Sequence, residues 1–212
     1  ATLDAFSATL ADLQFITDVR NATAGDTVTL TKDMTLTDVT ETTTGLIIPA
    51  GVTVDGKGHT ITVNTTAKSG SVSGIGLSND ATLKNVTVKM DDSKKAWADW
   101  KDNLVEVLAG SDVALADSTV VLENVAIENG TQAGLTLLNG SKVTLKGAVT
   151  LTDNAWGGIE IYKDANVTID QDATINYTAA ALGKPFAWVD DAVATEDVEK
   201  RLTAKTGLLT NN

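Results

Sequence analysis

The chain has 212 residues, no cysteine, and a net charge of −12 at pH 7. The absence of cysteine excludes a disulfide framework and a thiolate metal site, and the acidic balance argues against nucleic acid and anionic membrane surfaces as partners. No stretch is long and apolar enough to predict a membrane-spanning helix. Short runs of β-branched residues separated by Gly, Asn and Asp indicate an all-β protein with tight turns.

The N-terminal segment, residues 1–26, is predicted to be a capping helix. Ser7 is a candidate N-cap, and the helix is expected over 7–22 because apolar residues follow at intervals of three: Leu10, Leu13, Ile16 and Val19. We expect this helix to lie across the first coil of the fold that follows and to cover its exposed edge.

A unit of three short apolar–x–apolar runs, joined by turns, repeats along the next part of the chain. It is clearest in 45–64, 74–92, 134–154 and 158–177, and an incomplete unit over 27–37 opens the series. The first runs are Leu46/Ile48, Ile75/Leu77, Leu135/Leu137 and Ile159/Ile161. The second are Val52/Val54, Ala81/Leu83, Val143/Leu145 and Val167/Ile169, and the third are Ile61/Val63, Val86/Val88, Val149/Leu151 and Ala173/Ile175.

A further unit fits within 103–130, with a longer middle. Its first run is Val105/Val107 and its third is Val125/Ile127. Its second run is either Val113/Leu115 or Val120/Leu122, and the pattern does not choose between them.

Such short strands cannot bury their apolar pairs within one unit, but stacked units bury them as continuous columns. The repeat therefore predicts a right-handed parallel β-helix of about six coils over 27–178. An antiparallel sandwich is the alternative, but it explains the frequent turns without explaining why the same three-run unit returns.

The C-terminal segment, residues 179–212, is predicted to be a helical cap. Thr195 is a candidate N-cap, Val198 and Leu202 share one helical face, and Gly207 is a candidate C-cap. Phe186 and Trp188 are expected to lie over the last coil.

Three segments resemble right-handed β-helix domains of bacterial cell-surface proteins, which are related in fold to pectate lyases. They are "AGVTVDGKGHTITV" (50–63), "NATAGDTVTLTKD" (21–33) and "DNAWGGIEIYKDANVTI" (153–169). The resemblance covers about residues 7–177 and implies the β-helix architecture and an extracellular or surface-attached location. Its motifs leave the activity open.

The only histidine, His59, lies in "DGKGH", between the second and third runs of its unit. Gly56 and Gly58 are expected to supply the positive φ angles of a tight turn, and Asp55 to bond turn amides. A catalytic histidine needs a nucleophile or a carboxylate held by a second group, and no such set is visible. We therefore interpret His59 as a turn residue and name no catalytic residue.

An enzymatic role is the alternative that the resemblance brings with it. The related lyases use a basic residue, usually arginine, beside calcium-binding carboxylates, but Arg20 and Arg201 lie outside the repeats. Of the motifs implied for a polygalacturonase, only the Asp-Asp pair is present, as Asp91–Asp92 and as Asp190–Asp191, the latter at the start of the predicted C-terminal helical segment. A polysaccharide lyase or glycoside hydrolase therefore stands second to a non-enzymatic module of adhesin or structural type.

The candidate ligand-binding residues lie before the first runs of two units. Exposed indoles can stack on sugar faces while nearby polar side chains bond hydroxyl groups, so a glycan is the expected ligand. The alternative is a local hydrophobic cluster that covers a loop. The candidate set is Trp97, Trp100, Trp156, Asp91, Asp92, Asp99 and Asn154.

No cofactor and no metal site is predicted, because the Asp and Asn residues of the turns lack the fixed spacing of calcium β-rolls. Outward threonines, one per coil on each face, are the ordinary choice for a β surface rather than an ice-binding array. The expected partner is a glycan or a protein of a host or cell surface, and the expected state is a monomer or part of a larger multidomain chain.

Overall fold

The protein is a parallel β-solenoid with one helix at its N-terminal end. The computed structural model describes residues 3–39, 44–65, 72–91, 102–107, 119–138, 140–162, 164–178, 186–189 and 202–203. Every strand pair among them is parallel. The predicted fold class is confirmed, and the antiparallel sandwich is excluded.

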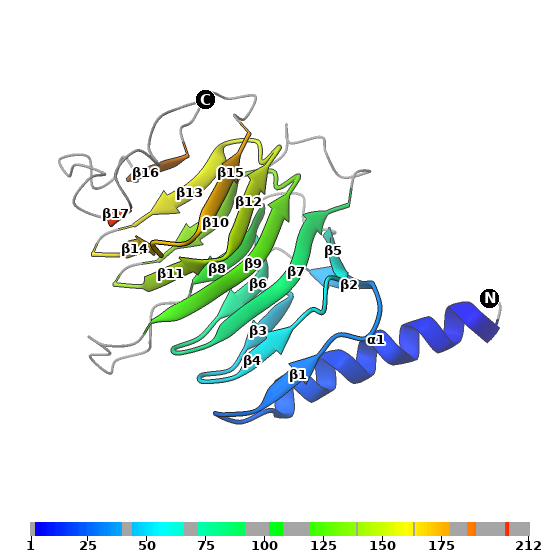
Figure 1. The fold of residues 1–212 in the computed structure, drawn as a ribbon. Helices are drawn as coiled ribbons and strands as arrows, with labels where there is room; N and C mark the ends of the chain where they lie inside the picture. The colour runs from blue at the N-terminus through cyan, green and yellow to red at the C-terminus, as the bar shows by residue number, and fades with distance from the viewer. Residues whose placement is uncertain are drawn as a thin grey trace.

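The first strands of successive units form a six-stranded sheet, called sheet B here. Its strands are β3 (Leu46–Ile48), β6 (Val72–Leu77), β8 (Asp102–Val107), β10 (Ala133–Leu137), β13 (Gly157–Ile161) and β16 (Ala187–Val189). Each pairs with the next in this order, so sheet B follows the solenoid axis from one end to the other (Figure 1).

The second and third strands form an eleven-stranded sheet, called sheet A. Its strands are β1 (Thr27–Thr29), β2 (Met34–Val39), β4 (Thr53–Asp55), β5 (Thr60–Thr65), β7 (Thr82–Met90), β9 (Val120–Glu128), β11 (Lys142–Lys146), β12 (Ala148–Thr152), β14 (Asn166–Ile169), β15 (Thr174–Tyr177) and β17 (Leu202–Thr203). In β7 and β9 the second and third runs merge into one bent strand.

The apolar pairs of the repeat form the core. The side chains of all three runs point inward and pack as one cluster, with Ala173 and Ile175 only partly buried at the last coil. The open choice in the unit 103–130 is settled, because Leu122 of β9 lies between Leu83 and Leu145 in the strand register. The second run is therefore Val120/Leu122.

The N-terminal helix α1 spans Leu3–Asn21 and lies across the first coil (Figure 1). The predicted start at Ser7 is wrong, because the helix begins four residues earlier with residues that all tolerate helical backbone. The predicted inward face is also partly wrong. Leu10 and Leu13 are 51% and 55% exposed, whereas Phe15 and Val19 are buried against the coil beside the half-buried Ile16.

The structure supports about four full turns, fewer than the six or so predicted. The strands β1 and β2 at one end, and β16 and β17 at the other, belong to incomplete turns.

The predicted C-terminal helix is wrong at Leu202–Thr203, which form β17 beside β14. The edge of β14 offers unpaired backbone N–H and C=O groups, and another parallel strand satisfies them where a helix does not. Phe186 closes the end of the core and contacts Tyr177 edge to face, with ring centroids 5.8 Å apart. The other residues of the predicted C-terminal helix lie outside the described residues.

Candidate ligand-binding surfaces

The turn that precedes the first strand of each coil, called the tryptophan corner here, holds the described members of the predicted site. Asp91 follows β7, and Asn154 and Trp156 lie between β12 and β13. Since β7 and β12 both pair with β9, these residues share one corner of the solenoid, two strand spacings apart. The predicted members Trp97, Trp100, Asp92 and Asp99 lie outside the described residues.

Asn154 has a structural position within this corner. Its side chain is buried, accepts a hydrogen bond from the Gly130 N–H at 2.9 Å, and donates one to the Ile127 carbonyl at 3.0 Å. It therefore ties its turn to the turn of the preceding coil. Trp156 remains half-buried, and its backbone N–H bonds the Gln132 carbonyl at 3.1 Å.

The outer face of sheet B carries a row of polar residues that sequence reasoning missed. The register places Thr136 of β10 directly between Glu106 of β8 and Glu160 of β13. We call these three residues the glutamate row. Thr136 and Glu160 are 1% and 5% exposed although they point away from the core.

The glutamate row is electrostatically unusual. Burial raises the pKa of Glu106 above its ordinary value, although a hydrogen bond from the Ser73 hydroxyl to Oε2, at 2.7 Å, opposes the rise. Within the described residues the buried Thr136 Oγ1 has no hydrogen-bond partner. A shielded carboxyl group that holds its proton more readily can donate as well as accept a hydrogen bond.

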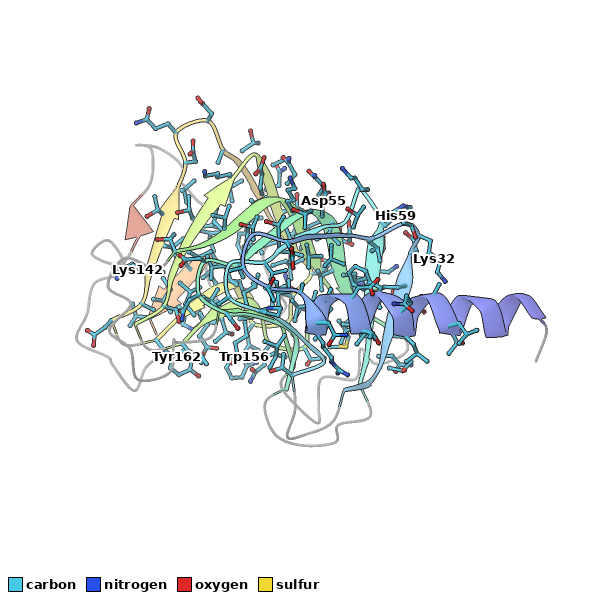
Figure 2. The ribbon with its side chains drawn as sticks, turned by 90° about the horizontal axis from the view of Figure 1, so that it is seen from below. Lys32, Asp55, His59, Lys142, Trp156 and Tyr162 are labelled. Carbon is cyan, nitrogen blue, oxygen red and sulfur yellow. The ribbon has the colours of Figure 1, made fainter. Side chains whose placement is uncertain are left out.

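Aromatic side chains lie at both ends of β13 on this side of the molecule. Trp156 precedes the strand, Tyr162 follows it, and both are half-buried. Figure 2 shows both on the side of the solenoid opposite Asp55 and His59. Among the described residues, the outer face of sheet A has no aromatic side chain, so sheet B combines rings with polar groups where sheet A does not.

The turn between the second and third strands is built differently, and we call it the asparagine corner. Asn85 donates from Nδ2 to Asp55 Oδ1 at 3.0 Å, and Asn124 donates from Nδ2 to Asn85 Oδ1 at 3.1 Å. The Ala148 N–H completes the ladder by donating to Asn124 Oδ1 at 3.0 Å. Each coil is thereby tied to the next through side-chain amides.

Asp55 carries the charge at the start of this ladder. Burial alone would raise its pKa, but hydrogen bonds from Asn85 and from the Lys57 backbone N–H, together with the Lys57 ammonium 2.9 Å away, lower the pKa to about 2. Asp55 is therefore held as a carboxylate by partners that are all part of the turn.

The stretch "DGKGH" is confirmed as the turn between β4 and β5. The expectation for Gly56 is wrong, because the positive φ angles belong to Lys57 and Gly58, at 52° and 85°. Glycine is required at 56 for space, since a Cβ there would lie 2.5 Å from Val86 Cβ. His59 Nδ1 lies 3.3 Å from Asp33 Oδ1, a carboxylate that also accepts the Thr60 N–H.

The glutamate row was present in the sequence pattern as the middle residue of each first run. That position reads Ile47, Gly76, Glu106, Thr136 and Glu160 along the chain. This position was not singled out from the sequence. The signal lay in two glutamates at places where the other coils carry apolar, small or neutral residues.

No family model, curated protein or solved structure matches this chain. Within the described ranges, no group of three or more His, Asp or Glu side chains is arranged to hold a metal ion. The one helix of the described part is not apolar enough to cross a membrane.

Proposed function

We propose that the protein is a non-enzymatic, extracellular surface module of adhesin or structural type that binds a glycan on the outer face of sheet B. The observation that carries the proposal is that the half-buried Trp156 and Tyr162, at the two ends of β13, lie on the same face as the half-buried Glu106 of the glutamate row. Rings that stack on sugar faces beside carboxyl and hydroxyl groups that bond sugar hydroxyls are the usual composition of such a site.

The charge of the chain narrows the ligand class. A net charge of −12 and two glutamates on the proposed face disfavour uronates and other anionic sugars. Neutral or cationic sugars are therefore the expected ligands. A solenoid with its core filled by apolar columns supplies the rigid support that such a surface needs, because rigid groups lose little entropy on binding.

The experiment is a glycan array followed by titration of each hit with a Trp156→Ala variant. Loss of ring stacking is expected to weaken binding about tenfold or more, equivalent to about 1.4 kcal/mol per decade. A Thr168→Ala variant, on the exposed face of β14, is the matched control and retains wild-type affinity. A Trp156→Ala variant with a lower melting temperature but unchanged affinity would assign Trp156 to packing alone and contradict the proposal.

Hydrolysis of a glycan on the same face is the second candidate, and the glutamate row favours it. Glu106 and Glu160 are two strand spacings apart, roughly 9.6 Å between Cα atoms, and side chains on that spacing can reach the roughly 6.5–9.5 Å between carboxyl groups of inverting glycosidases. Glu106, with its raised pKa, would be the proton donor. Release of reducing ends that Glu106→Gln abolishes, with glycan binding retained, would establish this candidate over the first.

A further inference from the structure

Sheet A is hollowed on its outer side along the asparagine corner. A groove with a volume of about 560 Å³ lies there, and its lining includes Lys57, Asn85, Thr87, Asn124, Ala126 and Thr150. These residues come from four successive coils, so the groove runs along the solenoid axis rather than along a strand. At roughly 4.8 Å per strand spacing it extends for roughly 14 Å.

The groove exists because the backbone bends sharply at equivalent positions of successive coils. Asn85, Asn124 and Gly147 all adopt the left-handed conformation, with φ angles of 52°, 53° and 60°. Each bend brings the outward faces of the second and third strands toward each other. Asparagine tolerates this conformation better than other residues with a side chain, which explains its use at two of the three positions.

The floor of the groove presents hydrogen-bonding groups that are already fixed in place. The ladder uses one of the two N–H groups on Nδ2 of Asn85 and of Asn124. The second N–H of each amide takes no part in the ladder, and both asparagines line the groove. Thr87, Ala126 and Thr150 lie in one register row along the wall, so the groove repeats small, neutral groups from coil to coil.

The row of charged residues that precedes the groove-lining positions in each coil has no excess of either charge. Asp55, Lys84, Glu123 and Lys146 lie in one register row across β4, β7, β9 and β11, and their signs alternate. Lys57 at one end is paired with Asp55. An ionic polymer would meet attraction and repulsion at alternate coils, so the groove fits an uncharged ligand.

We propose that this groove binds an uncharged linear glycan that lies along the solenoid axis, with successive sugars over successive coils. A β-linked pyranose chain advances per sugar by nearly the strand spacing, so successive sugars lie over successive coils, where they meet the amides of Asn85 and Asn124 and the hydroxyls of Thr87 and Thr150. An extended peptide fits less well, because its equivalent side chains recur at roughly 6.6 Å, out of step with the roughly 4.8 Å spacing of the coils. The site is separate from the sheet B surface and does not depend on it.

The test uses neutral oligosaccharides of cellulose, mannan and chitin, about two to six sugars long, with oligogalacturonate and an extended neutral peptide for comparison. Binding to the full chain is measured by isothermal titration and by NMR shifts. We expect affinity for a neutral series to rise with length up to about four sugars, the number of coils that line the groove.

An Ala126→Trp variant fills the groove from an outward position and should weaken this binding at least about tenfold. Thr168→Trp places the same side chain on exposed β14 outside the groove and is the control for folding and for indole itself. Trp156→Ala should leave the groove binding unchanged, which separates this site from the proposed function.

Binding that Ala126→Trp leaves intact and Trp156→Ala removes would support the sheet B surface and overturn the groove. Tighter binding of the oligogalacturonate or the peptide would also overturn it, as would failure of every neutral series to bind. Loss of neutral glycan binding in Ala126→Trp alone would uphold the groove even if the proposed function fails.

Discussion

The outer faces of sheets A and B rest on the same core but use their polar residues in different ways. On sheet A the charges alternate along the row from Asp55 to Lys146, and the asparagine corner joins its amides in a ladder. On sheet B the glutamate row places two carboxyl groups on either side of a buried threonine whose Oγ1 has no partner within the described residues.

The polar groups on sheet A stabilise the folded protein, whereas some of those on sheet B destabilise it. Paired and bonded groups on sheet A stabilise the stack of coils, whereas a shielded carboxyl with a raised pKa and an unbonded hydroxyl destabilise it. Groups that are retained at a cost in stability are the better candidates for function. The outer face of sheet B is therefore the first candidate for a ligand-binding surface.

The largest expected effect tests the core that both faces share. Leu145 of β11 is fully buried, so Leu145→Asp would place an unpaired charge in the apolar column and should unfold the protein. Circular dichroism at increasing temperature measures the loss. Thr144→Asp, one residue away on the outer face, is the control and should remain folded. A Leu145→Asp variant with the wild-type melting temperature would show that the inward assignment is wrong.

The second prediction is that the two faces respond to pH with opposite sign. The pKa of Asp55 is lowered to about 2 in the folded protein. The ionised Asp55 therefore stabilises the folded protein by up to about 2 kcal/mol at pH values above about 4, the ordinary pKa of aspartate, and this stabilisation is lost as the pH falls toward 2. The pKa of Glu106 is raised in the folded protein. The folded protein therefore has its full stability at pH values below 4.5, the ordinary pKa of glutamate, and it loses stability as the pH rises through that value.

Denaturant titrations of Asp55→Asn and Glu106→Gln between about pH 2 and pH 7 measure both effects. Asp55→Asn should destabilise the protein at pH 7 and much less at pH 2. Glu106→Gln should stabilise it at pH 7 and change little at pH 3. If the free energies of unfolding of the two variants changed with pH in the same direction, the predicted contrast between the two faces would be wrong.

A smaller effect is expected from Thr136→Val, which replaces the unbonded hydroxyl with a methyl group of similar shape. The free energy of unfolding should stay level or rise by about 1 kcal/mol, because a buried polar group without a partner is removed. Thr144→Val, at a half-buried outward position on sheet A, is the matched control and should be close to neutral. A clear loss of stability in Thr136→Val would mean that the hydroxyl is bonded in solution.

The smallest effect is expected at His59, on the sheet A side. His59→Ala removes a 3.3 Å contact with an exposed carboxylate and should lower stability by no more than about 1 kcal/mol, with any glycan binding unchanged. Melting temperature and affinity are measured on the same preparation. Loss of binding with the fold retained would give His59 a role that its place in the turn does not predict.

The fold was predictable because the alternating apolar residues of the repeat are the residues whose side chains point into the core. Leu135 and Leu137, or Val143 and Leu145, occupy the alternating positions that strand geometry requires, and each is buried. The ends were less predictable. Leu10 and Leu13 have helical spacing but remain exposed, because spacing shows that a helix has an apolar side without showing which side meets the coil.

The candidate site was predictable only in part. The order of the runs brought Asp91 and Trp156 to one corner, but it gave no sign that Asn154 is buried and bonded to two backbone groups. It also treated Gly56 as a residue of unusual φ, whereas the close approach of Val86 from the next coil explains the glycine. Such contacts join residues about thirty positions apart, which local patterns do not encode.

The sequence by itself determined the solenoid, since the recurrence of three apolar pairs leaves stacking as the way to bury them. Only the tertiary structure decided what the residues between those pairs do. Parallel pairing in register places the same position of each coil one strand spacing from the next. This pairing forms the glutamate row from Glu106, Thr136 and Glu160. It also forms the ladder from Asp55, Asn85 and Asn124. The register depends on the lengths of the turns. These lengths differ from coil to coil, whereas the spacing within the apolar runs does not.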